Sequence, residues 1–144
     1  MEKKDVTLLV IESAGEKGLS PIQIQKSLFL IVQSHLPALP SDFYEFYAYN
    51  YGPFCEEVYQ DADALVEEGL VFDMPVSGQS WSIYTIAPKG RERAEAIRRE
   101  NEIGDLAQYI KEIVEWVSAL TFSELLRAIY AKYPQYSENS VFQG

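Results

Sequence analysis

The chain has 144 residues, of which 22 are acidic and 12 are basic, and its formal net charge is −10. This length is typical of one domain that buries most of its apolar surface without disulfides or metals. The longest apolar runs are far shorter than the roughly 20 residues that a bilayer crossing needs, and the opening residues lack the apolar core of a secretory signal, so we expect a cytoplasmic protein with no membrane partner.

Apolar residues at helical spacing predict a first helix over residues 4–16. A second helix, over about residues 21–35, has a strong start signal. Ser20 can cap it, Pro21 suits its first position, and Gln23 can complete a capping box. This second helix is expected to bury Ile24, Leu28 and Ile31.

The next segment, residues 43–54, is dense in aromatic side chains (FYEFYAYNYGPF). Aromatic density favours an extended strand through Tyr49, and residues 50–53 have turn chemistry that would end it. Exposed aromatic rings give large contact areas at low entropic cost. An adhesive patch for a protein partner is therefore predicted at Tyr47, Tyr49 and Tyr51. The alternative, in which the rings belong to the core, applies first to Phe46 and Phe54.

A third helix is predicted over about residues 54–68, with Gly69 as its left-handed terminator, and it contains no Lys or Arg. A winged-helix protein would keep its DNA-reading helix here, but this helix has the wrong charge for phosphates. Its carboxylates could instead occupy a basic groove on a toxin or nuclease; the alternative is a solvated helix face. The predicted contact residues on this helix are Glu56, Glu57, Asp61 and Glu68.

A hairpin is predicted next, from the β-rich runs 70–74 and 81–86, and a charged helix over about 89–100 follows it. That helix carries the candidate nucleic-acid residues Lys89, Arg91, Arg93, Arg98 and Arg99. Interleaved glutamates and the acidic first half of the chain oppose this alternative, so nucleic acid is not the expected ligand. Two more helices are predicted, over about 102–119 and from a capping box at Thr121 to Pro134.

These elements predict an α+β fold, mostly α, in a single domain over residues 1–144. Residues 1–88 would form a winged-helix-like core with three helices, a short strand and a β-hairpin wing. Residues 89–135 would form a helical extension and residues 136–144 a flexible tail.

The run SPIQIQKSLFL, the aromatic segment ending in Tyr-Gly-Pro-Phe and the acidic helix ending in LVEEGLV resemble the SocA-like, or Panacea-domain, antitoxin-related family. The resemblance covers about residues 1–98. It implies a small bacterial or phage protein that neutralises a toxin by direct contact, and therefore a binding module rather than an enzyme.

The residues themselves offer little for catalysis, metals or cofactors. One cysteine, Cys55, and one histidine, His35, exclude a disulfide framework and a histidine-rich metal site. His35 lies at a predicted helix end beside Pro37, and no serine nucleophile elbow is present. Glu56 and Glu57 are adjacent on a helix and point in different directions, so they form no acid/base pair. We expect no enzymatic activity and no cofactor.

Three functional hypotheses remain. The first is a protein-binding module of the antitoxin or phage–host conflict type. The second is a winged-helix transcription regulator that binds DNA through the hairpin and the basic residues of the fourth helix. The third is a structural subunit of a larger assembly, which would form a homodimer through the apolar face around residues 110–117. The acidic first half favours the first hypothesis.

Overall fold

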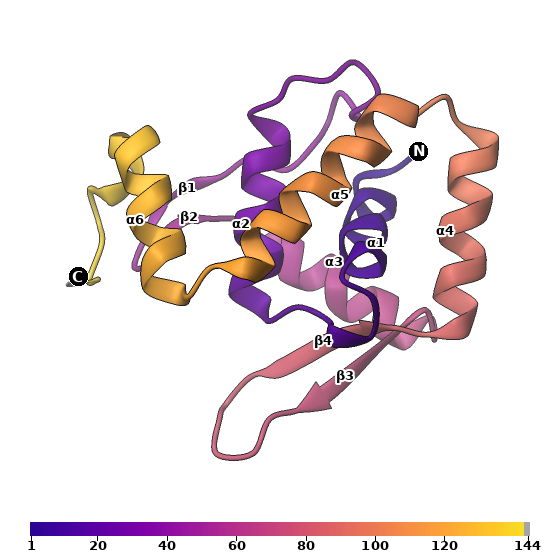
Figure 1. The fold of residues 1–144 in the computed structure, drawn as a ribbon, viewed down its shortest axis with the longest axis horizontal. Helices are drawn as coiled ribbons and strands as arrows, with labels where there is room; N and C mark the ends of the chain where they lie inside the picture. Colours follow the sequence, from indigo (N-terminus) through magenta and orange to yellow (C-terminus); the bar gives the residue numbers. More distant parts are fainter. Residues whose placement is uncertain (143–144) are drawn as a thin grey trace.

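The structure is a computed structural model that describes residues 1–142, and over this range it is mostly helical with two antiparallel β-hairpins (Figure 1). The predicted α+β, mostly α class is confirmed. In chain order the elements are α1 (Lys3–Ser13), η1 (Gly15–Lys17), α2 (Pro21–Val32), β1 (Tyr47–Tyr49), β2 (Gly52–Phe54), α3 (Glu56–Glu67), β3 (Val71–Pro75), β4 (Ser82–Ile86), α4 (Pro88–Glu100), α5 (Gly104–Ala119), α6 (Phe122–Lys132) and η2 (Pro134–Ser137).

Helix α1 lies in the centre of the core, and every residue from Val6 to Ile11 is buried. A helix that is apolar on nearly all sides needs neighbours on all sides, and α2, α3, α4 and α5 each pack against it. Helix α5 buries Ile110 and Val117 as it crosses α1 and α2 (Figure 1). The apolar face around residues 110–117, which the third hypothesis assigns to a homodimer, therefore packs partly inside this chain, and the homodimer stays a prediction.

Both predicted capping boxes are confirmed. The Gln23 backbone N–H donates to Ser20 Oγ at 3.3 Å, and the Ser20 N–H donates to Gln23 Oε1 at 2.9 Å. Thr121 and Glu124 make the same reciprocal pair at the start of α6. These boxes satisfy backbone donors that have no partner inside the helix. They were visible in the sequence because both partners lie within one turn.

The aromatic segment contains two strands rather than one. The predicted turn over residues 50–53 is wrong: only Asn50 and Tyr51 form the turn, and Gly52–Phe54 pairs with β1 in the register Tyr47↔Phe54 and Tyr49↔Gly52. The Gly-Pro pair predicts the end of a strand. Pro53 is nevertheless tolerated in β2 because this is an edge strand, where a residue without an N–H need not remove a hydrogen bond between the two strands.

The second hairpin, β3–β4, projects from the body of the protein (Figure 1). At its base the backbones of Leu19 and Tyr84 exchange two hydrogen bonds, at 2.9 and 3.0 Å. Gly18 makes this approach feasible: its φ is +69°, and a Cβ there would lie 2.6 Å from the Tyr84 carbonyl oxygen. No pattern in the sequence predicts this pairing, because a single residue shows no strand periodicity.

The predicted flexible tail, residues 136–144, differs from the structure over most of its length. Residues 134–137 form the turn η2, and the chain through Phe142 then lies against the β1–β2 hairpin. The reason is a set of polar contacts between segments about 90 residues apart in sequence, together with the aromatic packing of Phe142 against α6. Residues 143 and 144 lie outside the described residues.

Candidate protein-interaction surface

Three aromatic rings of the β1–β2 hairpin share one side of it. Tyr47 and Tyr49 are two residues apart in β1 and so point to the same face, and the register places Phe54 opposite Tyr47. The Phe54 ring centroid lies 5.8 Å from that of Tyr47, 5.0 Å from that of Tyr49 and 5.4 Å from that of Tyr59 on α3. Tyr47 is 50% exposed and Tyr49 46% exposed. We call these four residues the aromatic face.

Tyr51, the third predicted tyrosine, belongs to a different group. It lies in the hairpin turn, is 44% exposed, and packs edge-on against Phe122 at the start of α6, with centroids 5.5 Å apart. Phe142 in turn packs against Phe122 at 5.9 Å. Sequence reasoning missed both phenylalanines. Phe122 could have been found, because it directly follows the Thr121 cap and precedes the buried Leu125, Leu126 and Ile129 at the i+3, i+4 and i+7 spacing of one helix face.

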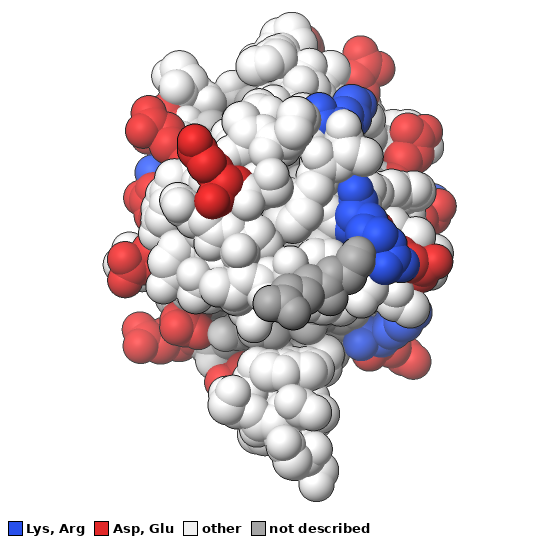
Figure 2. All heavy atoms as spheres, turned by 90° about the vertical axis from the view of Figure 1, so that its left-hand side faces the viewer, with Lys and Arg blue, Asp and Glu red and all other residues white. Residues whose placement is uncertain are grey.

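The hairpin, α6 and the C-terminal residues form one end of the molecule (Figure 1). Figure 2 shows that end face-on: most charged side chains lie around its margin, and its centre has few. An exposed surface that combines aromatic rings with a scarcity of charge is typical of the central part of a protein–protein interface.

A two-stranded hairpin is marginal in water by itself, and α2 supplies the buried polar groups that hold this one. The Gln25 side chain donates to the Cys55 carbonyl at 2.7 Å and accepts from the Cys55 N–H at 3.0 Å. Lys26 Nζ donates to the Pro53 carbonyl at 2.9 Å. Both side chains are buried, as is Cys55. The aromatic face is therefore anchored to the core through the backbone of β2 and the residue that follows it.

Lys26 is only 2% exposed, so its ammonium group has little access to water. Burial disfavours the charged form of a lysine, and it lowers the pKa of Lys26 from 10.5 to about 7. The neutral amine can still donate a hydrogen bond to the Pro53 carbonyl. Folding thus gives Lys26 a structural hydrogen bond and also makes its ammonium group lose its proton more easily than in the unfolded chain.

The predicted core role of Phe46 is confirmed, and that of Phe54 holds in part. Phe46 is half-buried and its ring meets that of the fully buried Phe29 edge-on at 5.6 Å. Phe54 is also half-buried, but it lies on the same face of the hairpin as the two exposed tyrosines of β1 and contacts both of their rings.

The acidic helix α3 does not present the free row of carboxylates that the sequence predicts. Glu57 pairs with Lys3 at 2.6 Å and Glu68 pairs with Lys4 at 2.9 Å. The prediction missed these pairs because Lys3 and Lys4 are distant in sequence, and only the packing of α1 along α3 brings them there. Glu57 and Glu68 are therefore paired within the chain, and their predicted contact role stays a prediction.

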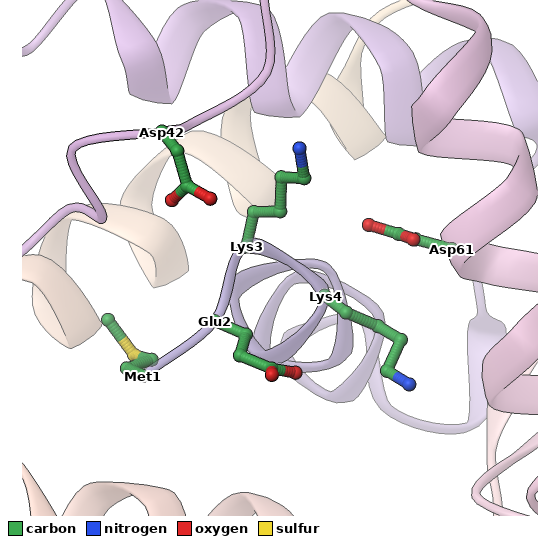
Figure 3. Close-up of a pocket in the computed structure, with 6 residues that line it drawn as sticks. All are labelled: Met1, Glu2, Lys3, Lys4, Asp42 and Asp61. Carbon is green, nitrogen blue, oxygen red and sulfur yellow. The ribbon is translucent and has the colours of Figure 1, made fainter.

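Asp61 is also engaged within the chain: the buried Tyr44 hydroxyl donates to it at 2.5 Å, and Thr7 Oγ1 lies 2.8 Å from the same hydroxyl. Burial, and then the bond to Asp61, raise the pKa of Tyr44 well above its ordinary value. Figure 3 shows the open pocket of about 320 Å³ at this place, where the Lys3 side chain extends between Asp42 and Asp61.

The two lysines remain charged over an extended pH range, because the hydrogen bonds to Glu57 and Glu68 raise the pKa of Lys3 and Lys4. Such partly exposed pairs contribute little to stability, but they reduce the charge that α3 offers to a partner. Of the predicted acidic contacts, Glu56 stays exposed on the first turn of α3, directly after the aromatic face.

The candidate nucleic-acid residues lie on α4, at the end of the molecule opposite α6 (Figure 1). Arg98 donates to Glu12 of α1 at 2.9 Å, and Arg93 lies 3.6 Å from Asp5. The other three basic residues, Lys89, Arg91 and Arg99, are exposed. The structure therefore separates this basic set from the aromatic face, and α1 neutralises part of it.

No family model matches the chain, and a search of curated proteins finds no significant match. The resemblance of residues 1–98 to the Panacea-domain family stays a prediction. Among residues 1–142 no helix has both the length and the apolar character needed to span a bilayer.

Proposed function

We propose that this protein is a non-enzymatic protein-binding module, and that it contacts its partner through the aromatic face of the β1–β2 hairpin. The observation that carries the proposal is the exposure of Tyr47 and Tyr49 beside Phe54, on the end of the molecule where charges are sparse. A tyrosine adds large contact area while few torsions must be fixed.

Preorganisation supports the same proposal. Gln25 and Lys26 hold the backbone of β2 and Cys55, and the Phe54 ring packs against both tyrosines. Few side chains and little backbone of the aromatic face therefore have to be ordered on binding, which lowers the entropic cost of association. We propose that the acidic helix contributes to the contact mainly through Glu56, at the margin of the aromatic face.

The core of the protein supports a winged-helix assignment as part of this proposal. The chain runs through α1, the Leu19 bridge, α2, α3 and then the β3–β4 wing, and Leu19 pairs with the inner strand of the wing. The β1–β2 hairpin is then an insertion between the second and third helices. Together with the resemblance to the SocA-like family, this arrangement leads us to propose an antitoxin-like role, in which the module neutralises a toxin or other partner by direct contact.

The winged-helix DNA-binding alternative is less well supported. Helix α3, which would enter the major groove, contains no Lys or Arg. The tip of the wing, residues 76–81, has no charged side chain, and Figure 2 shows the projecting wing as uncharged at its end. Duplex affinity comes mainly from cations placed against phosphates, and neither element supplies them.

Tyr47→Ala and Tyr49→Ala are each expected to weaken partner binding by about 30-fold, which is the effect of losing a hot-spot side chain worth about 2 kcal/mol. The partner would first be identified by affinity capture from the native host and mass spectrometry. The affinities of the purified variants would then be measured by calorimetry.

The matched control is Trp81→Ala, because Trp81 is also a large exposed aromatic side chain but lies on the wing. It should leave the affinity for the partner unchanged. If Trp81→Ala weakens binding while the two tyrosine variants do not, the wing is the contact surface and the proposal is wrong. Salt-sensitive retention of duplex DNA with no retained protein would favour the regulator instead.

A further inference from the structure

Residues 138–142, which we call the C-terminal strap, run along the β1 side of the hairpin. The Val141 backbone N–H donates to the Asn50 carbonyl at 2.9 Å. The Asn139 side-chain amide donates to the Ala48 carbonyl at 3.1 Å, and the Ser140 hydroxyl donates to the Asn50 carbonyl at 3.3 Å. The strap thus supplies donors to two carbonyls of the hairpin.

The need for these donors follows from the position of β1 at the edge of the hairpin. Backbone groups of an antiparallel strand point alternately toward the partner strand and away from it. At Ala48, opposite Pro53, the carbonyl points away from β2 and accepts from the Asn139 side chain of the strap. An edge strand with outward carbonyls is a template for a further extended segment, and here residues of the strap take that place.

Residues 138 and 139 form a turn, and from Ser140 to Phe142 the side chains alternate as those of an extended peptide do. Ser140 and Phe142 are half-buried, whereas Val141 between them is 56% exposed. Tyr130 donates to Ser140 Oγ at 2.8 Å, and the Phe142 ring lies 5.9 Å from Phe122 and 6.3 Å from Tyr130, centroid to centroid. The surface therefore accommodates one polar side chain and one aromatic side chain, which are two residues apart in the segment that lies on it.

We propose that this edge of the hairpin is a docking site for an extended peptide segment of the protein partner, and that the C-terminal strap occupies the site in its absence. The inference rests on the proposed function and adds the chemistry of the partner. The segment would carry a small hydroxyl or amide side chain at the position of Ser140 and an aromatic ring at the position of Phe142. Its backbone N–H would take the place of that of Val141 at Asn50.

The contacts of the strap are suited to displacement. Its hydrogen bonds to Ala48 and Asn50 through side chains are exposed to solvent. Segments with few buried contacts and solvent-exposed hydrogen bonds open at low free-energy cost. A tethered segment nevertheless competes with a free peptide at an effective concentration on the order of millimolar, so the strap should act as an internal inhibitor of peptide binding.

The test uses a fluorescent peptide with the sequence of residues 136–142, titrated with the full chain and followed by anisotropy. Phe142→Ala in the protein weakens the internal competitor, so the labelled peptide is expected to bind this variant at least about tenfold more tightly than the wild type. Val141→Ala is the matched control, because the Val141 side chain is exposed; this variant should bind the peptide as the wild type does.

A peptide in which alanine replaces the residue equivalent to Phe142 should lose affinity for the Phe142→Ala protein. Circular dichroism would verify that both protein variants remain folded. Equal affinity of the wild type and Phe142→Ala for the peptide, or no binding to either at millimolar concentration, would overturn the inference and make the strap a fixed part of the fold. The peptide assay needs no partner protein. A failure of this inference can therefore be distinguished from a failure of the proposed function, which is tested by the affinity of Tyr47→Ala for the partner.

Discussion

Gly90→Ala is expected to destabilise the protein by about 3 kcal/mol, the upper end of what overpacking costs in a well-packed structure. A Cβ at position 90 would lie 1.9 Å from the carbonyl oxygen of Leu70. Neither group can rotate away, because that oxygen belongs to the backbone just before β3, and the Ala87 N–H already donates to it at 3.0 Å. The first turn of α4 would have to move off the base of the wing.

Urea unfolding followed by circular dichroism measures this effect as a lower transition midpoint. Gly104→Ala is the matched control, because Gly104 opens helix α5 and a Cβ there meets no atom within 4 Å. Its free energy of unfolding should stay within about 0.5 kcal/mol of that of the wild type. Equal stabilities of Gly90→Ala and Gly104→Ala would show that α4 does not pack on Leu70 as described.

The wild-type protein is expected to gain about 3 kcal/mol of stability relative to Lys26→Met as the pH rises from about 7 to about 10. The unfolded chain keeps the Lys26 proton up to its ordinary pKa of 10.5, whereas burial lowers the folded-state pKa to about 7. Between these values the unfolded state binds more protons, so the free energy of unfolding rises with pH. Below about pH 7 both states are protonated and the difference becomes constant.

Denaturant titrations of both proteins at a series of pH values provide the measurement. Comparing the two chains removes the contribution of Lys3 and Lys4, whose raised pKa values favour folding until the solution becomes strongly alkaline. Lys26→Gln retains a donor for the Pro53 carbonyl and should show the same dependence of stability on pH as Lys26→Met. Parallel pH profiles for the wild type and both variants would mean that Lys26 is solvated in the folded protein.

Much of the fold was predictable from local signals. The capping boxes at Ser20 and Thr121 placed the starts of α2 and α6, and Gly69, with a φ of +77°, ends the α3 segment as predicted. Such signals are reliable because both partners of each interaction lie within a few residues. The hairpin at residues 71–86 was also found, because β-rich runs flank a Pro- and Gly-containing turn.

The candidate site was predicted only in part. Tyr47 and Tyr49 were identified by their aromatic density and are exposed. The second strand, Gly52–Phe54, was missed, since its pairing outweighs the turn preference of a Gly-Pro pair. The roles of Gln25 and Lys26 were missed because their partners lie about 30 residues away, and a polar residue in a helix gives no sign by itself that it is buried.

By itself the sequence determined the mostly helical class, the order of the elements, the helix starts and the aromatic character of the hairpin. Each of these depends on periodicity or on partners close in the chain. Only the tertiary structure decided that Lys3 and Lys4 neutralise part of α3. It also decided that Lys26 of α2 hydrogen-bonds to β2 and that residues 138–142 occupy the hairpin edge. Those contacts join segments far apart in sequence, and their geometry exists only after the helices have packed around α1.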